Sequence, residues 1–516
     1  MSTTIDGVPI ASMPDLGVVT DASSFVAEKS GSGRLAATAV ATYVTSKISI
    51  VSNLLSVKDF GAKGDGTTDD TAAINAMIAG VPSGASVYWP TGTYKTSSVI
   101  TVGKPMTWVG AGRLASTVST NQAAARIFVF NACVNITDMG FTCSVTPTSG
   151  VLLTYNAGAT RFRLVGFWMS NFASGITING TSDIMLIDGQ MFNWMSGGNG
   201  IVYIGGEAAV MDNLILQQGT RPGSGNGIVV QNGGIQLINS EIMACGTCLA
   251  LAPASGQAVV SMWVCNTAFD NAVNGVALEP LGTGVVARNW FIGCWMCSMD
   301  QSGVTLTSPS LGSINGVEFN NCHVLGNGID GFNLTDNRSV NVSWLNCQIS
   351  GNTNTGISLF AGAQNFSIIG CRIGAYGQFG NNGSGGINLG GASTYYRITD
   401  NDLNNGGINP LYGAGVQGGS NPGVNEFIYG NIGYVAQNRG GATIPAGQLG
   451  VVVSHGLSGT PRLTDIFLTN LTGVGNPPAV MPFVISPTAT TFTIEIGVAV
   501  GFGVTVSWKA VLPCSF

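Results

Sequence analysis

Residues 57–94 read VKDFGAKGDGTTDDTAAINAMIAGVPSGASVYWPTGTY, and this stretch decides the fold. A turn rich in glycine and aspartate leads into a short segment whose apolar residues recur at helical spacing. These apolar residues are Ala73, Ile74, Met77 and Ile78. Thr68 and Asp69 stand where their side chains can accept hydrogen bonds from the free N–H groups at the helix start. Because so short an amphipathic helix needs a surface to cover, we expect it to cap the open end of a β structure.

A repeat occupies the middle of the chain, from about residue 135 to about residue 433. Aligning its clearest copies gives a ladder of equivalent positions with a mean step of about 26 residues. The ladder positions are Met139, Phe167, Gly189, Asn213, Ser240, Cys265, Cys294, Cys322, Cys347, Cys371, Asn401 and Asn431. A step of this length fits one three-sided coil of a parallel β-helix, whereas a leucine-rich repeat would need a leucine consensus that is absent.

The residues two before and two after each ladder position are mostly apolar, as Ile238 and Ile242 are around Ser240. Period-2 alternation of this kind predicts that the ladder faces the interior and that the positions one before and one after it face outward. The five ladder cysteines should therefore form an interior column of free thiols. Asn401 and Asn431 should continue that column as an amide ladder. Cys245 and Cys248 have a metal-like spacing without matching partners, so we expect no metal.

The segment DFGAKGDGTTDDTAAI closely resembles the opening of the pectate-lyase-like family of right-handed parallel β-helices, which occurs in phage tailspikes and polysaccharide-degrading enzymes. In that family the segment is a cap that lies away from any catalytic site. The resemblance implies an all-β protein whose main domain is a right-handed, three-sided parallel β-helix. It carries no catalytic residues over to this chain.

Composition agrees with a β-solenoid, because glycine accounts for 75 of 516 residues and charged residues for only 9%. The net charge is −6 and there is no basic stretch, so we expect no nucleic-acid partner. No run of 18 apolar residues occurs, so we expect no membrane insertion. The first residues show no signal-peptide pattern, and we expect synthesis in a host cytoplasm with the eleven cysteines reduced.

The two ends of the chain flank the β-helix, which we place at residues 51–440. Residues 1–50 contain a helix-forming stretch and resemble the short segment that attaches phage tailspikes to the particle. Residues 441–516 read as short strands separated by turns, which predicts a β-sandwich. This last part resembles C-terminal domains of phage tail proteins that trimerise the spike or bind a surface.

Together, these resemblances imply a bacteriophage tailspike located in the virion tail. Such a protein would be a homotrimer attached to a tail or baseplate protein through its N-terminus. It would bind and hydrolyse a bacterial surface polysaccharide, either capsule or O-antigen, without a cofactor. Two alternatives stay open at this point: a non-catalytic receptor-binding or structural tail protein, and a polysaccharide lyase.

Hydrolysis of a glycan generally needs two carboxylates, and the ladder places three candidates on the outward face. Asp188 and Asp212 each precede a ladder position in adjacent coils, about 5 Å apart by strand spacing. Glu241 follows the next ladder position, on a diagonal of roughly 8 Å from Asp212 that leaves room for a water in an inverting enzyme. Trp168 and Trp295 share the column of Glu241 and offer aromatic faces to sugar rings.

A lyase would instead need a base and a cation. His323 and Arg372 fall in the same outward column two coils apart, with Gln348 between them, and fit those two roles. Both residues are also candidates for substrate binding. Four later carboxylates could equally form a site across a loop or between subunits. They are Asp270, Glu279, Asp300 and Asp330.

Overall fold

The computed structural model describes residues 55–512 apart from 207, 220–222, 309–310, 337, 361, 392, 404–410, 413–426, 436 and 474–480. Four two-residue strands are also described near the start, in two antiparallel pairs: β1 (Thr4–Ile5) with β2 (Val8–Pro9), and β3 (Phe25–Val26) with β4 (Arg34–Leu35). The helix expected within residues 1–50 lies outside the described residues.

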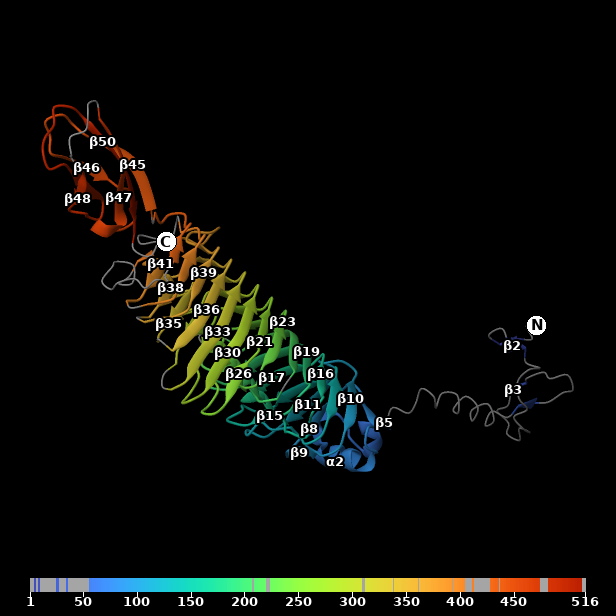
Figure 1. The fold of residues 1–516 in the computed structure, drawn as a ribbon. Helices are drawn as coiled ribbons and strands as arrows, with labels where there is room; N and C mark the ends of the chain where they lie inside the picture. Colours follow the sequence, from blue (N-terminus) through green and yellow to red (C-terminus); the bar gives the residue numbers. More distant parts are fainter. Residues whose placement is uncertain are drawn as a thin grey trace.

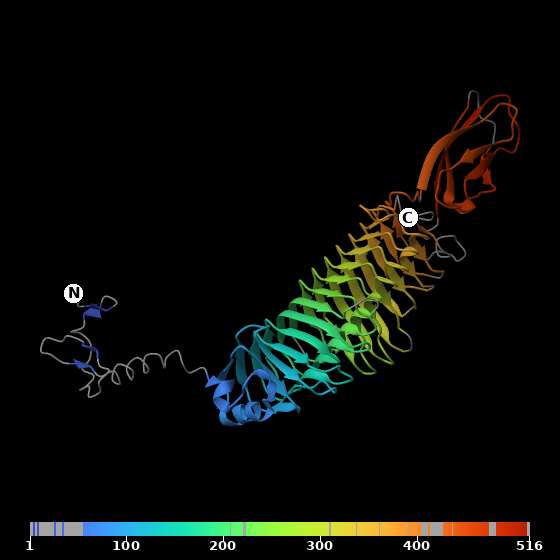
Figure 2. The same cartoon turned by 180° about the vertical axis from the view of Figure 1, so that it is seen from behind.

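The body of the molecule is a right-handed parallel β-helix that rises as an elongated rod from the cap to the C-terminal sheets (Figures 1 and 2). One 27-stranded sheet covers its first and second sides, and one 13-stranded sheet covers its third side. Strands pair in parallel with their equivalents one coil away, which confirms the predicted fold class.

The first side is built from β5 (Leu55–Ser56), β7 (Ser86–Trp89), β10 (Met106–Gly110), β13 (Val134–Thr137), β16 (Arg163–Val165), β19 (Met185–Trp194), β21 (Ala209–Gln217), β23 (Ile235–Ile238), β26 (Ala258–Val260), β27 (Trp263–Cys265), β30 (Val285–Ile292), β33 (Ser313–Asn320), β36 (Ser339–Leu345), β39 (Ser367–Ile369), β42 (Arg397–Thr399) and β44 (Phe427–Tyr429). The second side, into which β19 and β21 continue, is built from β6 (Asp65–Asp69), β8 (Gly92–Thr96), β11 (Ser116–Thr120), β14 (Gly140–Cys143), β17 (Trp168–Phe172), β24 (Glu241–Met243), β28 (Ala268–Asp270), β31 (Trp295–Cys297), β34 (His323–Leu325), β37 (Gln348–Ser350) and β40 (Arg372–Ile373). The third side is built from β9 (Ile100–Val102), β12 (Phe128–Phe130), β15 (Val151–Tyr155), β18 (Ser174–Asn179), β20 (Asn199–Ile204), β22 (Asn226–Asn232), β25 (Thr247–Leu251), β29 (Asn274–Leu278), β32 (Val304–Leu306), β35 (Phe332–Leu334), β38 (Thr355–Leu359), β41 (Gly385–Leu389) and β43 (Leu411–Tyr412).

The cap consists of the 3₁₀ turn η2 (Val57–Phe60) and the helix α2 (Thr71–Gly80), at the blue end of the rod (Figure 1). The helix buries Ile74, Met77 and Ile78 against the first coils, as its apolar stripe predicted. Such burial seals the open end of the β-helix, where strand edges would otherwise be exposed to pairing.

The aspartates of the cap hold the turn before the helix. Asp70 is almost fully buried and accepts hydrogen bonds from the N–H groups of Lys63 (2.6 Å) and Gly64 (3.0 Å). The Asp69 carboxylate accepts from the N–H of Thr71 (3.0 Å), as predicted. The prediction for Thr68 is wrong, because its hydroxyl donates to the Asp65 carboxylate (2.7 Å) rather than accepting from the helix.

A column of left-handed residues forms the corner between the first and second sides. Its members have φ between 49° and 70°. They are Asp138, Gly166, Asp188, Asn213, Asn239, Asn266, Gly293, Asn321, Asn346, Gly370, Asp400 and Gly430. Glycine, asparagine and aspartate adopt this conformation at the lowest cost, which explains why these residue types recur here.

This corner corrects the predicted ladder at two positions. Gly189 pairs with Leu214, not with Asn213, which is a corner residue. Glu241 pairs with Ala268, so Thr267 takes the interior position that we had assigned to Cys265. Cys265 instead pairs with Ile238 and Ile292 on the outward face of the first side. The interior cysteine column therefore has four members, namely Cys294, Cys322, Cys347 and Cys371.

The corner also breaks the period-2 alternation. The residue two before each ladder position was expected to be interior, yet Ile238 and Ile292 are only half-buried and face outward. The fully buried residue lies three before the ladder, as Leu237 and Phe291 show. The left-handed residue turns the chain at the corner, so the alternation of inward and outward side chains starts again there.

Polar columns complete the interior. Asn401 donates its amide hydrogen to the side-chain oxygen of Asn431 (2.8 Å), which confirms the predicted amide ladder. A second ladder joins Asn327, Asn352 and Asn382 through two hydrogen bonds of 2.8 Å. The ten described cysteines are free thiols, and Cys514 lies outside the described residues.

Two three-stranded antiparallel sheets follow the β-helix and pack as the predicted β-sandwich. One contains β45 (Gln437–Ile444), β50 (Val504–Val511) and β47 (Ile466–Gly473), preceded by the turn η3 (Leu463–Asp465). The other contains β46 (Gly450–Ser454), β49 (Thr491–Glu495) and β48 (Phe483–Ile485). Phe492 lies between the sheets, against Trp508 (ring centroids 5.3 Å apart) and the fully buried His455 (6.1 Å). His455 thus has a structural role.

Candidate functional site

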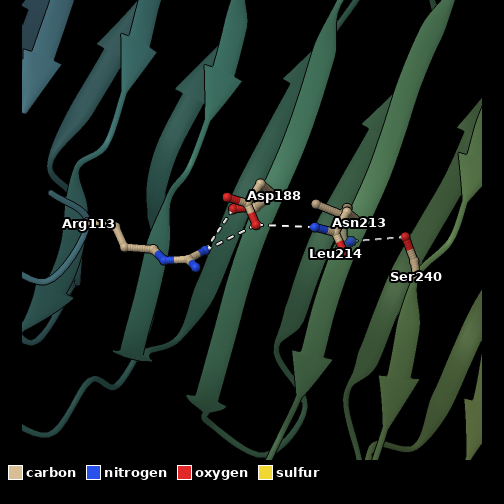
Figure 3. Close-up of polar contacts among 5 residues, drawn as sticks. All are labelled: Arg113, Asp188, Asn213, Leu214 and Ser240. Carbon is tan, nitrogen blue, oxygen red and sulfur yellow. Dashed lines mark hydrogen bonds and ion pairs between the residues drawn. The ribbon is translucent and has the colours of Figure 1, made fainter.

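Asp188 lies in the corner column rather than on a strand face (Figure 3). Its carboxylate forms an ion pair with Arg113 (3.4 Å) and accepts a hydrogen bond from the side-chain amide of Asn213 (3.2 Å). The predicted geometry is wrong, because Asp212 pairs with Ile187 and Asp188 stands opposite Asn213. These contacts of Asp188 therefore stabilise the corner of the β-helix.

Asp212 and Glu241 lie on different sides of the β-helix. Asp212 ends the first-side part of its coil and accepts a hydrogen bond from the side-chain amide of Asn239 (3.0 Å). Glu241 begins the second side, beyond the corner residue Asn239. The predicted diagonal between Asp212 and Glu241 on one flat face is therefore wrong.

One outward column of the second side matches the prediction. Strand pairing runs through Trp168, Gln190, Ile215, Glu241, Ala268, Trp295, His323, Gln348 and Arg372. Glu241 is half-buried, and the indole of Trp295 stacks on the imidazole of His323 (5.6 Å, 24° between the rings). This column therefore offers an acid and an aromatic platform within four successive coils.

Asp270 is the carboxylate that the corrected register brings near Glu241. Glu241 pairs with Ala268, and Asp270 lies two residues further along β28 with its side chain on the same face. Two residues along a strand and one coil across give a diagonal of roughly 8 Å. An inverting glycosidase has its two carboxyl groups about 6.5–9.5 Å apart.

The other candidates occupy different surroundings. Arg372 forms an ion pair with Asp402 (3.3 Å) and lies over the Tyr376 ring (5.8 Å), beside a small pocket of about 220 Å³. Asp330 is buried, and loss of hydration raises the pKa of its carboxyl group, which accepts a hydrogen bond from the N–H of Thr355 (2.9 Å). Asp330 is thus part of the interior.

A second aromatic pair lies on the first side. Trp263 and Trp290 occupy equivalent positions in neighbouring coils and stack with ring centroids 4.6 Å apart. Trp263 is 44% exposed. A groove of about 620 Å³ opens beside it, with Gln236, Asn232, Val260, Ala208 and Ser261 among its lining residues.

Sequence reasoning missed this pair for a definite reason. In the true register, Trp263 and Trp290 both stand four residues before the ladder positions Thr267 and Cys294. When Cys265 is placed on the ladder, the two tryptophans stand at different distances from their ladder positions, so they do not fall in one column. The Gly, Asn and Asp residues of the left-handed corner, one of which precedes each ladder residue, were the signal that could have corrected it.

The described residues show neither a metal-ligand cluster nor a membrane-spanning helix. Within the described residues, no group of three or more His, Cys, Asp and Glu side chains is arranged to hold a metal ion. Cys245 and Cys248 lie in the interior with their sulfurs 3.8 Å apart. No helix in the described part of the chain is long and apolar enough to span a membrane.

Comparison with known families agrees with this architecture. Residues 54–299 match the sequence model of the rhamnogalacturonase A/epimerase, pectate-lyase-like family. The matched part, which is a little under half of the chain, comprises the cap and the first coils of the parallel β-helix. The pectate-lyase-like resemblance of the cap sequence is thereby confirmed.

Two solved structures are similar to this chain. Pre-mature gene product 12 of bacteriophage phi29 is 14% identical, with a TM-score of 0.52 over 77% of this chain and 58% of that one. The Dettilon tailspike protein is 12% identical, with a TM-score of 0.48 over 90% of this chain and 95% of that one. At these identities the likeness concerns the fold alone.

Among curated sequences, alginate lyase 7 from Azotobacter vinelandii is 60% identical over 43 residues. That match spans 8% of this chain and 5% of the relative. This chain thus shares only a short segment with this relative, and the segment says nothing about shared activity.

Proposed function

We propose that this protein is a phage tailspike that binds a bacterial surface polysaccharide along its β-helix. The observation that carries the proposal is the presence of two outward aromatic stacks, Trp263 with Trp290 and Trp295 with His323. Flat aromatic faces on a long, regular surface suit the rings of a chain-like sugar. The phage proteins of similar fold support the tailspike assignment.

We further propose that the protein hydrolyses the bound glycan. Of the three predicted carboxylates, Glu241 is the strongest candidate, with Asp270 as its partner across about 8 Å. Ala268 between Glu241 and Trp295 is small, which leaves room for a sugar above the strand. Asp188 and Asp212 are weaker candidates, because Asp188 lies in the corner column and Asp212 lies on the first side, whereas Glu241 lies on the second.

A lyase is the less favoured alternative. His323 and Arg372 do share a column with Gln348 between them, as predicted. However, Asp402 already neutralises the Arg372 guanidinium that a lyase would direct at a substrate carboxylate. A protein that only binds the glycan would use the same aromatic surfaces without the carboxylates.

The proposal includes an assembly. A homotrimer would place three β-helices side by side in the virion tail, with residues 1–50 attached to a tail or baseplate protein. The C-terminal sheets leave apolar side chains exposed for contact with other subunits or with the host surface, including Val452 and Phe483. Light scattering at the monomer mass of 52.8 kDa would contradict the trimer.

The test of activity is product analysis after incubation with purified polysaccharide from a susceptible host. New reducing ends without absorbance near 235 nm would indicate hydrolysis, whereas that absorbance would indicate a lyase. Glu241→Gln and Asp270→Asn should each abolish cleavage while keeping binding. If both variants stay fully active, the assigned pair is wrong, and Asp212→Asn becomes the next variant to assay. Retained binding without fragments would leave only the binding function.

A further inference from the structure

Small residues at one corner of the coil are among those that line the groove beside Trp263. Ala208, Gly234 and Ser261 occupy equivalent positions in three successive coils and form its floor. In the coil before them, Asp183 forms an ion pair with Arg161 (3.7 Å). In the coil after Ser261, Arg288 takes the equivalent position, so charged residues flank this column at both ends without being among the described lining residues of the groove.

The groove lining is uncharged. All the described residues that line it are apolar, glycine, amide or hydroxyl residues. The residue between Gly206 and Ala208 in the sequence is Glu207, an acidic residue. An anionic sugar placed here would lose hydration without gaining a cationic partner from the described lining, which costs free energy. The lining therefore disfavours a uronate or a phosphorylated sugar.

The polar groups that do line the groove match sugar hydroxyls. Asn232 and Gln236 bring amide donors and acceptors, and Ser261 brings a hydroxyl. The Asn232 oxygen already accepts a hydrogen bond from the N–H of Ala258 (3.3 Å), which orients the amide. Trp263 supplies the apolar face, and its stacking on Trp290 holds the ring in place. Together these residues offer the combination that an uncharged pyranose ring needs.

We propose that this groove binds an uncharged stretch of glycan, and hence that the receptor polysaccharide is neutral where it crosses the first side. The inference rests on the proposed polysaccharide-binding function and adds the chemical class of the ligand. The volume of about 620 Å³ is typical of sites for small ligands, so the groove would hold a short part of the chain.

The experiment screens the full chain against purified bacterial capsule and O-antigen polysaccharides, both neutral and acidic, and titrates those that bind by calorimetry. We expect the bound polysaccharides to be neutral, with an affinity nearly unchanged between about 0.05 M and 0.5 M NaCl, because no ion pairs are screened. Trp263→Ala should weaken binding by about tenfold or more. Trp263→Phe should restore most of it.

Two controls make the outcome decisive. Phe360→Ala removes a similarly exposed ring outside the groove (49% exposed) and should leave affinity unchanged. Thermal melting should show that Trp263→Ala remains folded. Salt-sensitive, Trp263-dependent binding of an acidic polysaccharide would overturn the inference but not the proposed function. Unchanged affinity in Trp263→Ala would exclude the groove. Absence of binding to every polysaccharide would overturn both.

Discussion

Trp344 and Trp263 lie on the same side of the β-helix, in β36 and β27, but on its opposite faces. Trp344 points inward, is fully buried and contacts the rings of Phe332 (5.8 Å) and Phe319 (6.5 Å). Trp263 points outward, is 44% exposed and stacks on Trp290. The same residue type therefore serves packing on one face and is available for recognition on the other.

The difference between the two faces is general in this molecule. Interior columns keep one chemistry over several coils, as the four cysteines and the amide ladders do, because each side chain packs on its equivalents above and below. Outward columns change from coil to coil, as the run from Glu241 through Ala268 to Trp295 shows. Columns whose residue type repeats from coil to coil therefore belong to the interior scaffold. The candidate site lies in outward columns, where the residue type changes.

The largest expected effect is the difference in free energy of unfolding between alanine variants of the two tryptophans. Trp344→Ala should lower the free energy of unfolding by about 3–5 kcal/mol, because it leaves a cavity in the core. Trp263→Ala should lower it by less than about 1 kcal/mol, because half-exposed residues lose little packing. Chemical denaturation of both variants measures this directly. Equal losses would mean that Trp263 is a packing residue.

A second prediction compares cysteines on the two faces. Cys265 faces outward and is half-buried, whereas Cys347 lies in the interior column. Hydrogen bonds with Cys322 and Cys371, together with burial, raise the pKa of Cys347, whereas burial, followed by the charge interaction with Cys322, raises the pKa of Cys265. Because both thiols are protonated near neutral pH, access decides reactivity.

Iodoacetamide should therefore label Cys265 at least about tenfold faster than Cys347 in the folded protein. Mass spectrometry of the labelled peptides resolves the two sites, and labelling after unfolding provides the reference rates. Equal protection of Cys265 would instead support its place in the interior column and would contradict the register described here.

A smaller expected effect is the dependence of the stability of the cap on pH. Hydrogen bonds from the backbone and side chain of Thr68 lower the pKa of Asp65, and hydrogen bonds from Ser97 and Thr71 lower the pKa of Asp69. A carboxyl group whose pKa is lower in the folded state stabilises the fold above its unfolded pKa of about 4 and loses that contribution as the pH falls towards the folded pKa.

We therefore expect amide hydrogen exchange in α2 to accelerate as the pH falls below about 4, beyond the intrinsic pH dependence of exchange. The Asp69→Asn variant should show a weaker acceleration, because one of the two groups no longer titrates. Exchange in β31, far from the cap, is the internal control. Identical pH dependence in the variant would show that Asp69 does not stabilise the cap.

The smallest expected effect belongs to Asp188. Its ion pair with Arg113 is half-exposed, and asparagine is well tolerated in the left-handed conformation. Asp188→Asn should change the free energy of unfolding by no more than about 0.5–1 kcal/mol and should leave polysaccharide cleavage intact. Complete loss of cleavage in a folded Asp188→Asn protein would show that Asp188 belongs to the catalytic site.

The sequence predicted those features that depend on a single local pattern. The cap helix, the parallel β-helix, the Asn401–Asn431 contact and the column shared by Glu241, Trp295 and His323 follow from spacing within short segments. The carboxylate geometry failed because it depended on register across coils of unequal length. Asp188 failed because the position before each ladder residue is a left-handed corner, and Asp212 failed because the ladder residue of its coil is Leu214 rather than Asn213.

The most direct test of the account is a crystal structure of the full chain with an oligosaccharide made from its receptor polysaccharide. We predict sugar rings against the outward faces of the β-helix, with one ring over Trp263 in the groove and others near Trp295. Sugar density confined to the C-terminal sheets, with none at either tryptophan, would contradict the claim that the outward faces of the β-helix bind the glycan.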